Sequence, residues 1–503
     1  MNIKKISIVI LAVFMILSLG VSTVRAIEDL QLGCEVELGI SGYLKNETYI
    51  RAWHGPDDIM SCRNVFNLDL DFSFPGIPIV RRMFIELRPV YDAVFDWENE
   101  GTGGGTSKLR KRFQDNFGVA DDWDPLLREC WVDLSIGKLD ARLGKQLVSW
   151  GKSDGIWMLD LINPFNWRNP SVFEEEDTKI PLWMVNLEYH VKPMQTLQFL
   201  FIPRYVPAMN PFDGHDWAAN ITTWVEDYDA FLSLPQSAWG PGANIKTREP
   251  GTSLSNAEYG LRWSGWWKGI SYTLNYFYTW DDYLNQYPTG AWWDYGTAVG
   301  MGYPYFVNTE YTYRADRLSI FGGSFDYCWD YFLGLKQVVT RAEFAYLKND
   351  VWYNYDVGLE EKDNIGVLLG FDKYFFIDYW TSIQVQASYI LDAHGHDSYY
   401  DLGSGYHGAD AAGLGSGMRD ALELNYTLYV MKDYLPGDTL HTEWFLMYDD
   451  DGAFWFRPKV KYDVSDQFHV SLGANLFWGK EDDPFVGESR NNDNLFVEFL
   501  WGF

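Results

Sequence analysis

Charged side chains lie an even number of residues apart in three stretches of this sequence, 69–71, 82–88 and 129–133, and a further charge stands at residue 142. In an extended strand such positions share one face, so charges on neighbouring strands would meet on a common wall. A charged wall that lines a channel sets ion selectivity. The alternative is an ion-pair network that only stiffens the wall. The residues assigned to this wall are Asp69, Asp71, Arg82, Glu86, Arg88, Glu129, Asp133 and Arg142.

Five of these eight residues are acidic and three are basic, which gives the wall a net charge of −2 when all are ionised. A low-dielectric wall focuses such a field into a channel, so the sequence predicts a weak cation preference. The basic run at residues 108–112 is the opposing feature, since it could enter the channel as an anion site. The run could instead contact lipopolysaccharide phosphates or simply be solvated.

The stretch 143–164 combines turn-forming residues with a short motif. Gly151 and Gly155 permit backbone conformations that β-branched residues cannot adopt, and Asp154 can cap a turn between them. Two hypotheses follow: a loop that folds into the lumen and forms the constriction, or a rim turn that fixes strand order. The constriction candidates in this stretch are Trp150, Asp154 and Asn163.

Enzyme chemistry has one candidate pair, His469 and Ser471. Their spacing is found in an outer-membrane phospholipase family, where a histidine base activates a serine nucleophile. That chemistry needs an asparagine partner and access to lipid, whereas strand alternation turns both side chains towards the lumen. The sequence therefore predicts that the protein is not an enzyme.

Metal chemistry is also weakly indicated, and we predict no resident cofactor. The histidines near residues 394–410 could bind a transition metal at a loop tip, or be ordinary polar loop residues. The acidic stretches 174–177 and 449–451 could recruit Ca²⁺ at outer loops and bridge anionic lipopolysaccharide.

Strand-like alternation extends far beyond the charged stretches and specifies two faces. Residues 35–52, 65–74, 382–389, 422–428 and 468–476 each alternate apolar with polar side chains. Short links, such as 137–138 and 192–194, alternate with long Gly-, Asp- and Trp-rich segments, such as 95–124 and 208–255. This is the pattern of an all-β transmembrane antiparallel barrel with short periplasmic turns and long outer loops. We count about eighteen strands; sixteen is the alternative, because 305–329 and 440–463 have weaker patterns.

Both ends of the chain fit this architecture. The last stretch, 494–503, is apolar at every odd position from Leu495 and resembles the closing strand that the outer-membrane assembly machinery reads. Its signal residues would be Phe499, Trp501 and Phe503. Residues 1–26 have the charged, apolar and small-residue regions of a cleaved signal peptide, leaving 27–503 as a single barrel domain. An uncleaved anchor and a lipid-modified Cys34 are the alternatives.

Composition excludes one class of partner. Removing Lys4, Lys5 and Arg25 with the signal peptide leaves 37 basic and 70 acidic residues, a charge of −33, which opposes nucleic-acid binding. The aromatic fraction of 18% suits the aromatic girdles of a barrel. Four cysteines, Cys34, Cys62, Cys130 and Cys328, would lie in an oxidising compartment, and Cys62 could pair with Cys130 near the outer rim.

The series Leu143 to Gln146, Trp150-Gly151, Asp154-Gly155 and Asn163-Pro164 resembles the outer-membrane family known as domain of unknown function 1302. The resemblance implies a Gram-negative outer-membrane channel that handles hydrophobic compounds together with export systems, and it assigns no functional residue. Three function classes remain: a transport channel, a barrel that holds a partner such as an electron-transfer protein, and a lipid-modifying enzyme. The polar lumen face favours the channel. The expected partners are outer-membrane lipid and lipopolysaccharide, the assembly machinery and an inner-membrane exporter.

Overall fold

The computed structural model describes residues 27–31, 36–52, 59–93, 126–153, 157–166, 175–208, 244–282, 285–293, 307–354, 358–375, 378–393, 399–400, 421–435, 437–479, 486 and 488–503. The predicted signal peptide therefore lies outside the described residues. Within these ranges, no helix has the length and apolar character needed to cross a membrane.

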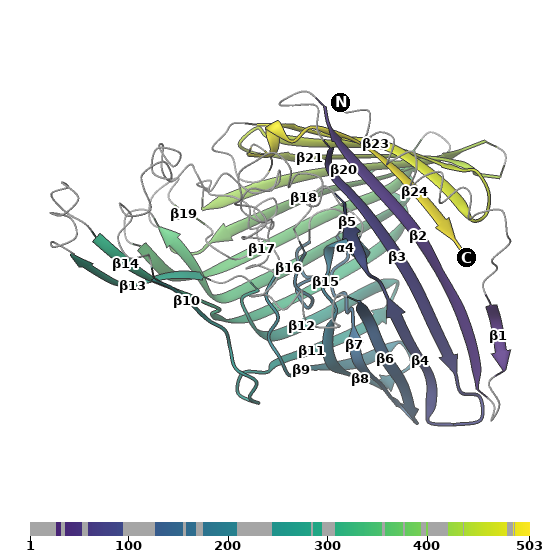
Figure 1. Cartoon of the computed structure of the whole chain (residues 1–503), viewed down its shortest axis with the longest axis horizontal. Helices are drawn as coiled ribbons and strands as arrows, with labels where there is room; N and C mark the ends of the chain where they lie inside the picture. The colour runs from purple at the N-terminus through teal and green to yellow at the C-terminus, as the bar shows by residue number, and fades with distance from the viewer. Residues whose placement is uncertain are drawn as a thin grey trace.

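Eighteen strands of the described part of the chain close into one antiparallel barrel (Figure 1). Consecutive strands pair with one another, and β24 completes the ring by pairing with β2 from Tyr43↔Gly502 to Arg51↔Asn494. The predicted all-β barrel and its count of eighteen are confirmed. The strands are β2 (Glu37–Arg51), β3 (Ile59–Ser73), β4 (Val80–Leu87), β6 (Leu127–Ile136), β7 (Leu139–Gln146), β8 (Leu182–Lys192), β9 (Gln195–Ile202), β11 (Glu258–Trp267), β12 (Ile270–Trp280), β15 (Arg317–Phe332), β16 (Leu335–Asn354), β17 (Gly358–Phe375), β18 (Tyr379–Ile390), β20 (Leu422–Tyr434), β21 (Leu440–Asp449), β22 (Phe454–Asp463), β23 (Phe468–Trp478) and β24 (Asn494–Gly502).

Short elements add to the ring. β1 (Ile27–Gln31) lies along β2, β5 (Val90–Asp92) continues β4 along β3, and β19 (Tyr399–Tyr400) pairs with the end of β16. A separate three-stranded sheet, formed by β10 (Asn244–Arg248), β13 (Asn285–Trp293) and β14 (Val307–Arg314), projects beyond one end of the barrel (Figure 1). The uncertain stretch 305–329 therefore contains β14 of this sheet and most of barrel strand β15. The helical turns α4 (Glu175–Thr178) and η5 (Glu488–Asn491) complete the list of described elements.

The two ends of the barrel differ as the sequence predicted. Residues 137–138, 193–194 and 268–269 make tight links at one end, whereas the connections from β7 to β8 and from β9 to β11 at the other end are long. The outward face is apolar and the inward face is largely polar. On β18, for example, Val385 is 36% exposed on the outside and Gln386 points inward. The wall is therefore built to face lipid on one side.

The expected pairing of Cys62 with Cys130 is wrong. Cys62 is on β3 and Cys130 is on β6, with β4 between them. Two strand spacings amount to about 10 Å, which exceeds the Cα separation of a disulfide. Cys62, Cys130 and Cys328 form no disulfides with one another, and Cys34 lies outside the described residues.

Candidate functional site inside the barrel

The described parts of the connection from β7 to β8, residues 147–181, pack against the inner face of the barrel, and this connection is called the luminal segment. Its described parts are 147–153, 157–166 and 175–181, and Asp177 of α4, labelled beside β5 in Figure 1, contacts Lys45 and Arg63 of the wall. Of the two hypotheses for this stretch, the geometry matches a loop inside the lumen and not a rim turn. Its role as a constriction remains a prediction.

Asn163 closes the neck of the luminal segment. Its Oδ1 accepts a hydrogen bond from the backbone N–H of Val148 at 2.8 Å. Its Nδ2 donates to the carbonyl oxygens of Gln146 at 3.3 Å and Ile180 at 2.9 Å. Because these groups belong to the exit of β7 and the approach to β8, one buried amide fixes where the segment leaves and rejoins the wall.

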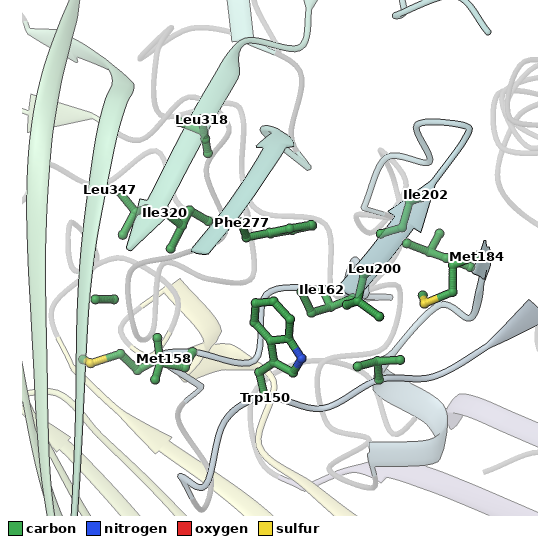
Figure 2. Packing of buried hydrophobic residues seen from close by; sticks show 14 of the residues in the cluster. Trp150, Met158, Ile162, Met184, Leu200, Ile202, Phe277, Leu318, Ile320 and Leu347 are labelled. Carbon is green, nitrogen blue, oxygen red and sulfur yellow. The ribbon is translucent and has the colours of Figure 1, made fainter. Parts of the chain in front are cut away.

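Trp150 anchors the segment to the barrel wall. The side chain is 2% exposed, its Nε1–H donates to Gln198 Oε1 at 2.9 Å, and its ring meets Phe277 edge-on at 6.1 Å between centroids. Gly260 makes room for the ring, since a Cβ there would lie 3.0 Å from Trp150. Figure 2 shows the indole between the segment and the strand residues Phe277 and Leu200.

Met158 and Ile162 continue this contact along the wall (Figure 2), and Leu159 belongs to the same buried cluster. Leu159 fits over Gly322 on β15, where a Cβ would lie 2.3 Å from the leucine side chain. The wall here is apolar, unlike the largely polar inward face elsewhere: where the segment covers the strands, the contact is a protein core and not a solvated lumen. This inner apolar patch includes Leu200, Ile202, Phe277, Leu318, Ile320, Leu347 and Leu368.

Polar side chains of the wall hold the backbone of the segment. Glu343 on β16 accepts hydrogen bonds from the N–H of Lys152 and, at 3.3 Å, from the N–H of Leu159. Arg341 donates to the carbonyl oxygen of Lys152 at 2.9 Å. The Nζ of Lys152 donates to Asp326 Oδ2 at 2.5 Å. The segment is thus fixed by directional bonds as well as by apolar packing.

Asp160 links the two halves of the segment. It accepts hydrogen bonds from Ser149 Oγ at 2.9 Å, from the N–H of Trp150 at 3.2 Å, and from Lys179 Nζ. Gly151 packs against it, because a Cβ at residue 151 would lie 2.9 Å from the Cβ of Asp160. In the Trp-Gly pair of the sequence motif, Trp150 therefore packs its indole against the wall, and Gly151 leaves space for Asp160 because it has no side chain.

The second end of the segment binds the opposite part of the wall through Asp177 of α4. The Asp177 carboxylate contacts Lys45 at 3.0 Å, Arg63 at 2.9 Å and Arg88 at 3.0 Å. Glu47 pairs with the first two of these cations at 3.1 and 2.8 Å. Burial opposes ionisation of Asp177, but the charges of Arg63, Lys45 and Arg88 outweigh it and hold the pKa of this carboxyl well below its usual range.

Aromatic contacts complete the crossing of the bore. Phe165 belongs to a buried cluster with Tyr49 of β2, Phe445 of β21 and Phe496 of β24, and Trp157 stacks on Phe165 at 5.0 Å. The segment therefore contacts β9, β12, β15 and β16 on one side and β2 and β3 on another, where Phe165 also joins the cluster with β21 and β24. It bridges the interior and does not merely line one wall.

The predicted charge wall exists, and much of it is paired. Arg82 binds Asp71 through two bonds of 2.7 and 2.6 Å, and these side chains are 45% and 40% exposed. Arg142 binds Asp133 in the same bidentate way at 2.7 and 2.8 Å. Both guanidinium groups flank Trp131, with the Arg142 carbon 3.6 Å from the ring centroid.

The other predicted wall residues have different partners. Asp69, Glu86 and Glu129 stand directly opposite one another across β3, β4 and β6. Glu86 accepts a hydrogen bond from Asn67 at 2.8 Å, and Glu129 accepts one from Trp131 Nε1 at 2.8 Å. Arg88 forms an ion pair with Asp177 of the luminal segment.

The family model for DUF1302, described as a protein of unknown function, matches residues 57–503. The chain belongs to this family. The resemblance that rested on the short motif is confirmed over most of the sequence, and the family description leaves its function open. No curated protein matches the chain.

Solved structures similar to this DUF1302 member have low sequence identity, and one of them is described as a porin. Pseudomonas aeruginosa OccK3 is 10% identical, with 93% of this chain and 95% of that chain covered and a TM-score of 0.48. A BenF-like porin from Pseudomonas fluorescens is 10% identical, with 93% and 98% covered and the same TM-score. Acinetobacter baumannii OccAB2 is 9% identical, again with 93% and 98% covered and a TM-score of 0.48. We base no functional argument on these likenesses.

The motif residues of this DUF1302 member mostly shape the site. Gly144 has a φ of +139°, and a Cβ there would lie 2.1 Å from the carbonyl oxygen of Cys130. A side chain at that position is excluded, and Trp131 of the neighbouring strand pairs with it. Gln146 donates to the carbonyl oxygens of Arg142, Gly144 and Met184 at 3.2 to 3.4 Å. These bonds fix the exit of β7 towards the segment.

Some sequence-predicted residues do not join the site. Ser471 donates to Glu498 at 2.9 Å, and His469 contacts Asp463 at 2.5 Å, so each side chain of the proposed catalytic pair is engaged elsewhere. Asp154, the basic run 108–112 and the histidine loop 394–398 and 401–410 lie outside the described residues. Within the described ranges no group of three or more ligating side chains is arranged to hold a metal ion. The Ca²⁺ expectation stays a prediction, although Asp177 of its first acidic stretch is bound to cationic side chains inside the barrel.

Sequence reasoning missed the residues that hold the segment. Asp160, Lys179 and Glu343 were not assigned a role, and Asp177 was considered only as part of an acidic stretch that could recruit Ca²⁺ at an outer loop. The ion pair of Asp160 with Lys179 spans 19 residues, that of Asp177 with Lys45 spans 132, and the bond of Glu343 to Leu159 spans 184. Alternation along residues 35–52 did place Lys45 on the inward face. What alternation could not supply was the carboxylate from the distant loop that binds it.

Proposed function

We propose that this protein is an outer-membrane channel of a Gram-negative bacterium that passes small solutes, and that the luminal segment is its constriction. One observation carries the proposal: a closed barrel with an apolar exterior is crossed inside by a segment that is fixed to separate parts of the wall by Trp150, Glu343 and Asp177. A polar lumen interrupted by one such segment is the architecture of a selective pore.

The contacts of the segment indicate how passage would be controlled. Solutes would pass between the wall and a segment that has moved away from it. This movement requires loss of the Glu343 hydrogen bonds or of the Asp177 ion pairs. Withdrawal of Leu159 and Ile162 would uncover the inner apolar patch. An uncovered apolar surface favours solutes with an apolar part, which supports the hydrophobic substrates implied by the family resemblance.

The location and partners follow as part of the proposal. The barrel would lie in outer-membrane lipid and lipopolysaccharide after insertion by the assembly machinery, and an inner-membrane exporter is the partner that a solute-exporting channel would need. We propose a transport role without catalysis.

Planar-bilayer recording tests the function. Leu159→Ala removes a buried side chain from the contact with β15, a change that costs about 2 to 5 kcal/mol in packed cores. We expect larger or more frequent openings than in the wild-type protein. The control is Leu274→Ala, which removes the same atoms from a side chain that is 64% exposed on the outer face.

Equal currents in the wild-type protein and both variants would contradict the role of the segment. An absence of conductance in all three proteins would contradict the channel itself and favour a barrel that holds a partner.

A further inference from the structure

The three cationic side chains around Asp177 form a site that already holds a carboxylate. Asp177 Oδ1 accepts hydrogen bonds from a terminal nitrogen of Arg63 and of Arg88, and Oδ2 accepts one from Lys45 Nζ. All three cations come from the barrel wall, on β2, β3 and the residue after β4, whereas the carboxylate comes from the luminal segment. The wall therefore supplies a preformed receptor and the segment supplies its occupant.

Departure of Asp177 would remove a negative charge from this site. Each of the three cations contacts Asp177, so each would lose one ion pair, while Glu47 would still contact Lys45 and Arg63. Removing an acid from a buried cluster of charges is costly, so departure of Asp177 favours entry of another anion.

Contacts within the segment connect this site to the constriction. Asp177 is two residues from Lys179, which binds Asp160, and Asp160 holds the N–H of Trp150. Displacement of α4 would therefore pull on the contacts that keep Trp150 against the wall. The link consists of two residues of backbone followed by two successive hydrogen bonds.

We propose that Lys45, Arg63 and Arg88 form a binding site for solutes that carry a carboxylate and an apolar body, and that Asp177 occupies this site as a tethered competitor until such a solute displaces it. The inference rests on the proposed function and names the substrate class of the same segment. The apolar body would be received by the adjacent apolar cluster, which includes Phe165 and Tyr49. Tyr49 is two residues after Glu47 and shares its inward face.

Competition by a tethered group predicts weak binding to the wild-type protein. A group on a short tether acts at an effective concentration in the millimolar range, which a free solute must exceed or offset with further contacts. Asp177→Asn keeps the shape of the side chain and removes its charge. The variant should therefore remove the competing negative charge from the site while leaving the segment in place.

The experiment is calorimetric titration of the purified full-length barrel with butyrate and, as the uncharged probe of the same shape, butyramide. We expect Asp177→Asn to bind butyrate at least about tenfold more tightly than the wild-type protein, since one hydrogen bond to a charged group changes affinity by at least about this factor. Butyramide should bind no better to the variant. Asp433→Asn is the matched control, because Asp433 faces the lumen beside His441 and makes no ion pair with the segment.

A second variant keeps the test decisive. Adding Arg88→Gln to Asp177→Asn should abolish the gain for butyrate, with circular dichroism confirming that each variant is a folded β-barrel. Butyrate binding that Asp177→Asn does not strengthen, or an equal gain for butyramide, would overturn the proposal.

Planar-bilayer current separates this proposal from the proposed function. A protein that conducts but shows no butyrate gain retains the channel and refutes the carboxylate site. A protein that shows the gain but never conducts supports the site and refutes the channel.

Discussion

Glu343→Gln should loosen the luminal segment more than any other conservative change in the wall. The Glu343 carboxylate is 2% exposed and accepts backbone N–H bonds from Lys152 and Leu159 through different oxygens. A glutamine has one oxygen and one NH₂ group, so in either orientation one N–H of the segment meets a donor. One charge-assisted bond is lost and a buried donor is left without an acceptor.

The expected cost follows from those two bonds. Losing a hydrogen bond to a charged group costs about 1.5 to 3 kcal/mol. Because about 1.4 kcal/mol corresponds to a factor of ten, the population of detached segment should rise roughly tenfold to a hundredfold. Opening frequency in planar bilayers and exchange of the Lys152 and Leu159 amide hydrogens should both increase by that order.

The control for this prediction is Glu498→Gln. Glu498 is also buried on the inward face, at 7% exposure, but it accepts a hydrogen bond from Ser471 and makes none of the described bonds to the luminal segment. If both variants changed amide exchange at Lys152 and Leu159 equally, or if neither did, the assignment of Glu343 as an anchor of the segment would be refuted.

Three further predictions concern the wall, its closure and its electrostatics. Leu369→Arg puts a charge at an outward position near the middle of β17, where the leucine is 58% exposed, and should cost about 2 to 4 kcal/mol of unfolding free energy in vesicles. Ser41→Arg, at an exposed inward position, should cost little. Equal costs would rule out the assigned faces. Phe503→Asp should reduce the outer-membrane level of the protein, measured by fractionation, because it replaces the terminal aromatic side chain, which lies beside Gly42 and Trp501 at the closing seam, with a charge. A normal level would contradict the role of this side chain in assembly. The lowered pKa of Asp177 means that its ion pairs stabilise the fold above the unfolded-state pKa of about 3.9, and that this stabilisation is lost as pH falls through the folded-state pKa. The difference in unfolding free energy between wild type and Asp177→Asn should therefore be constant from pH 7 to about 5 and shrink in stronger acid. A difference that shrank between pH 7 and 6 would contradict this assignment.

The faces of the strands could be predicted because they depend on local alternation alone. In an extended chain, residues two apart share a face, so Asp71 and Val385 were assigned to opposite sides of the wall without knowledge of their neighbours. The same regularity assigned Asp133 and Arg142 to one inward face, and the structure shows that the two-residue turn between β6 and β7 sets them directly opposite one another. Strand number followed from counting these units, and barrel closure from the apolar face of the last strand.

The course of the luminal segment was decided by the tertiary structure. Residues 143–164 were compatible with a rim turn or an inward loop, since glycines permit both. The choice depends on Gly260 and Gly322, which leave room for Trp150 and Leu159, and on Glu343, which lies 184 residues from the Leu159 amide that it binds. Sequence alternation specifies which way a wall residue points, but a loop has no such period. Its position is set by contacts with distant strands, which exist only once the barrel has closed.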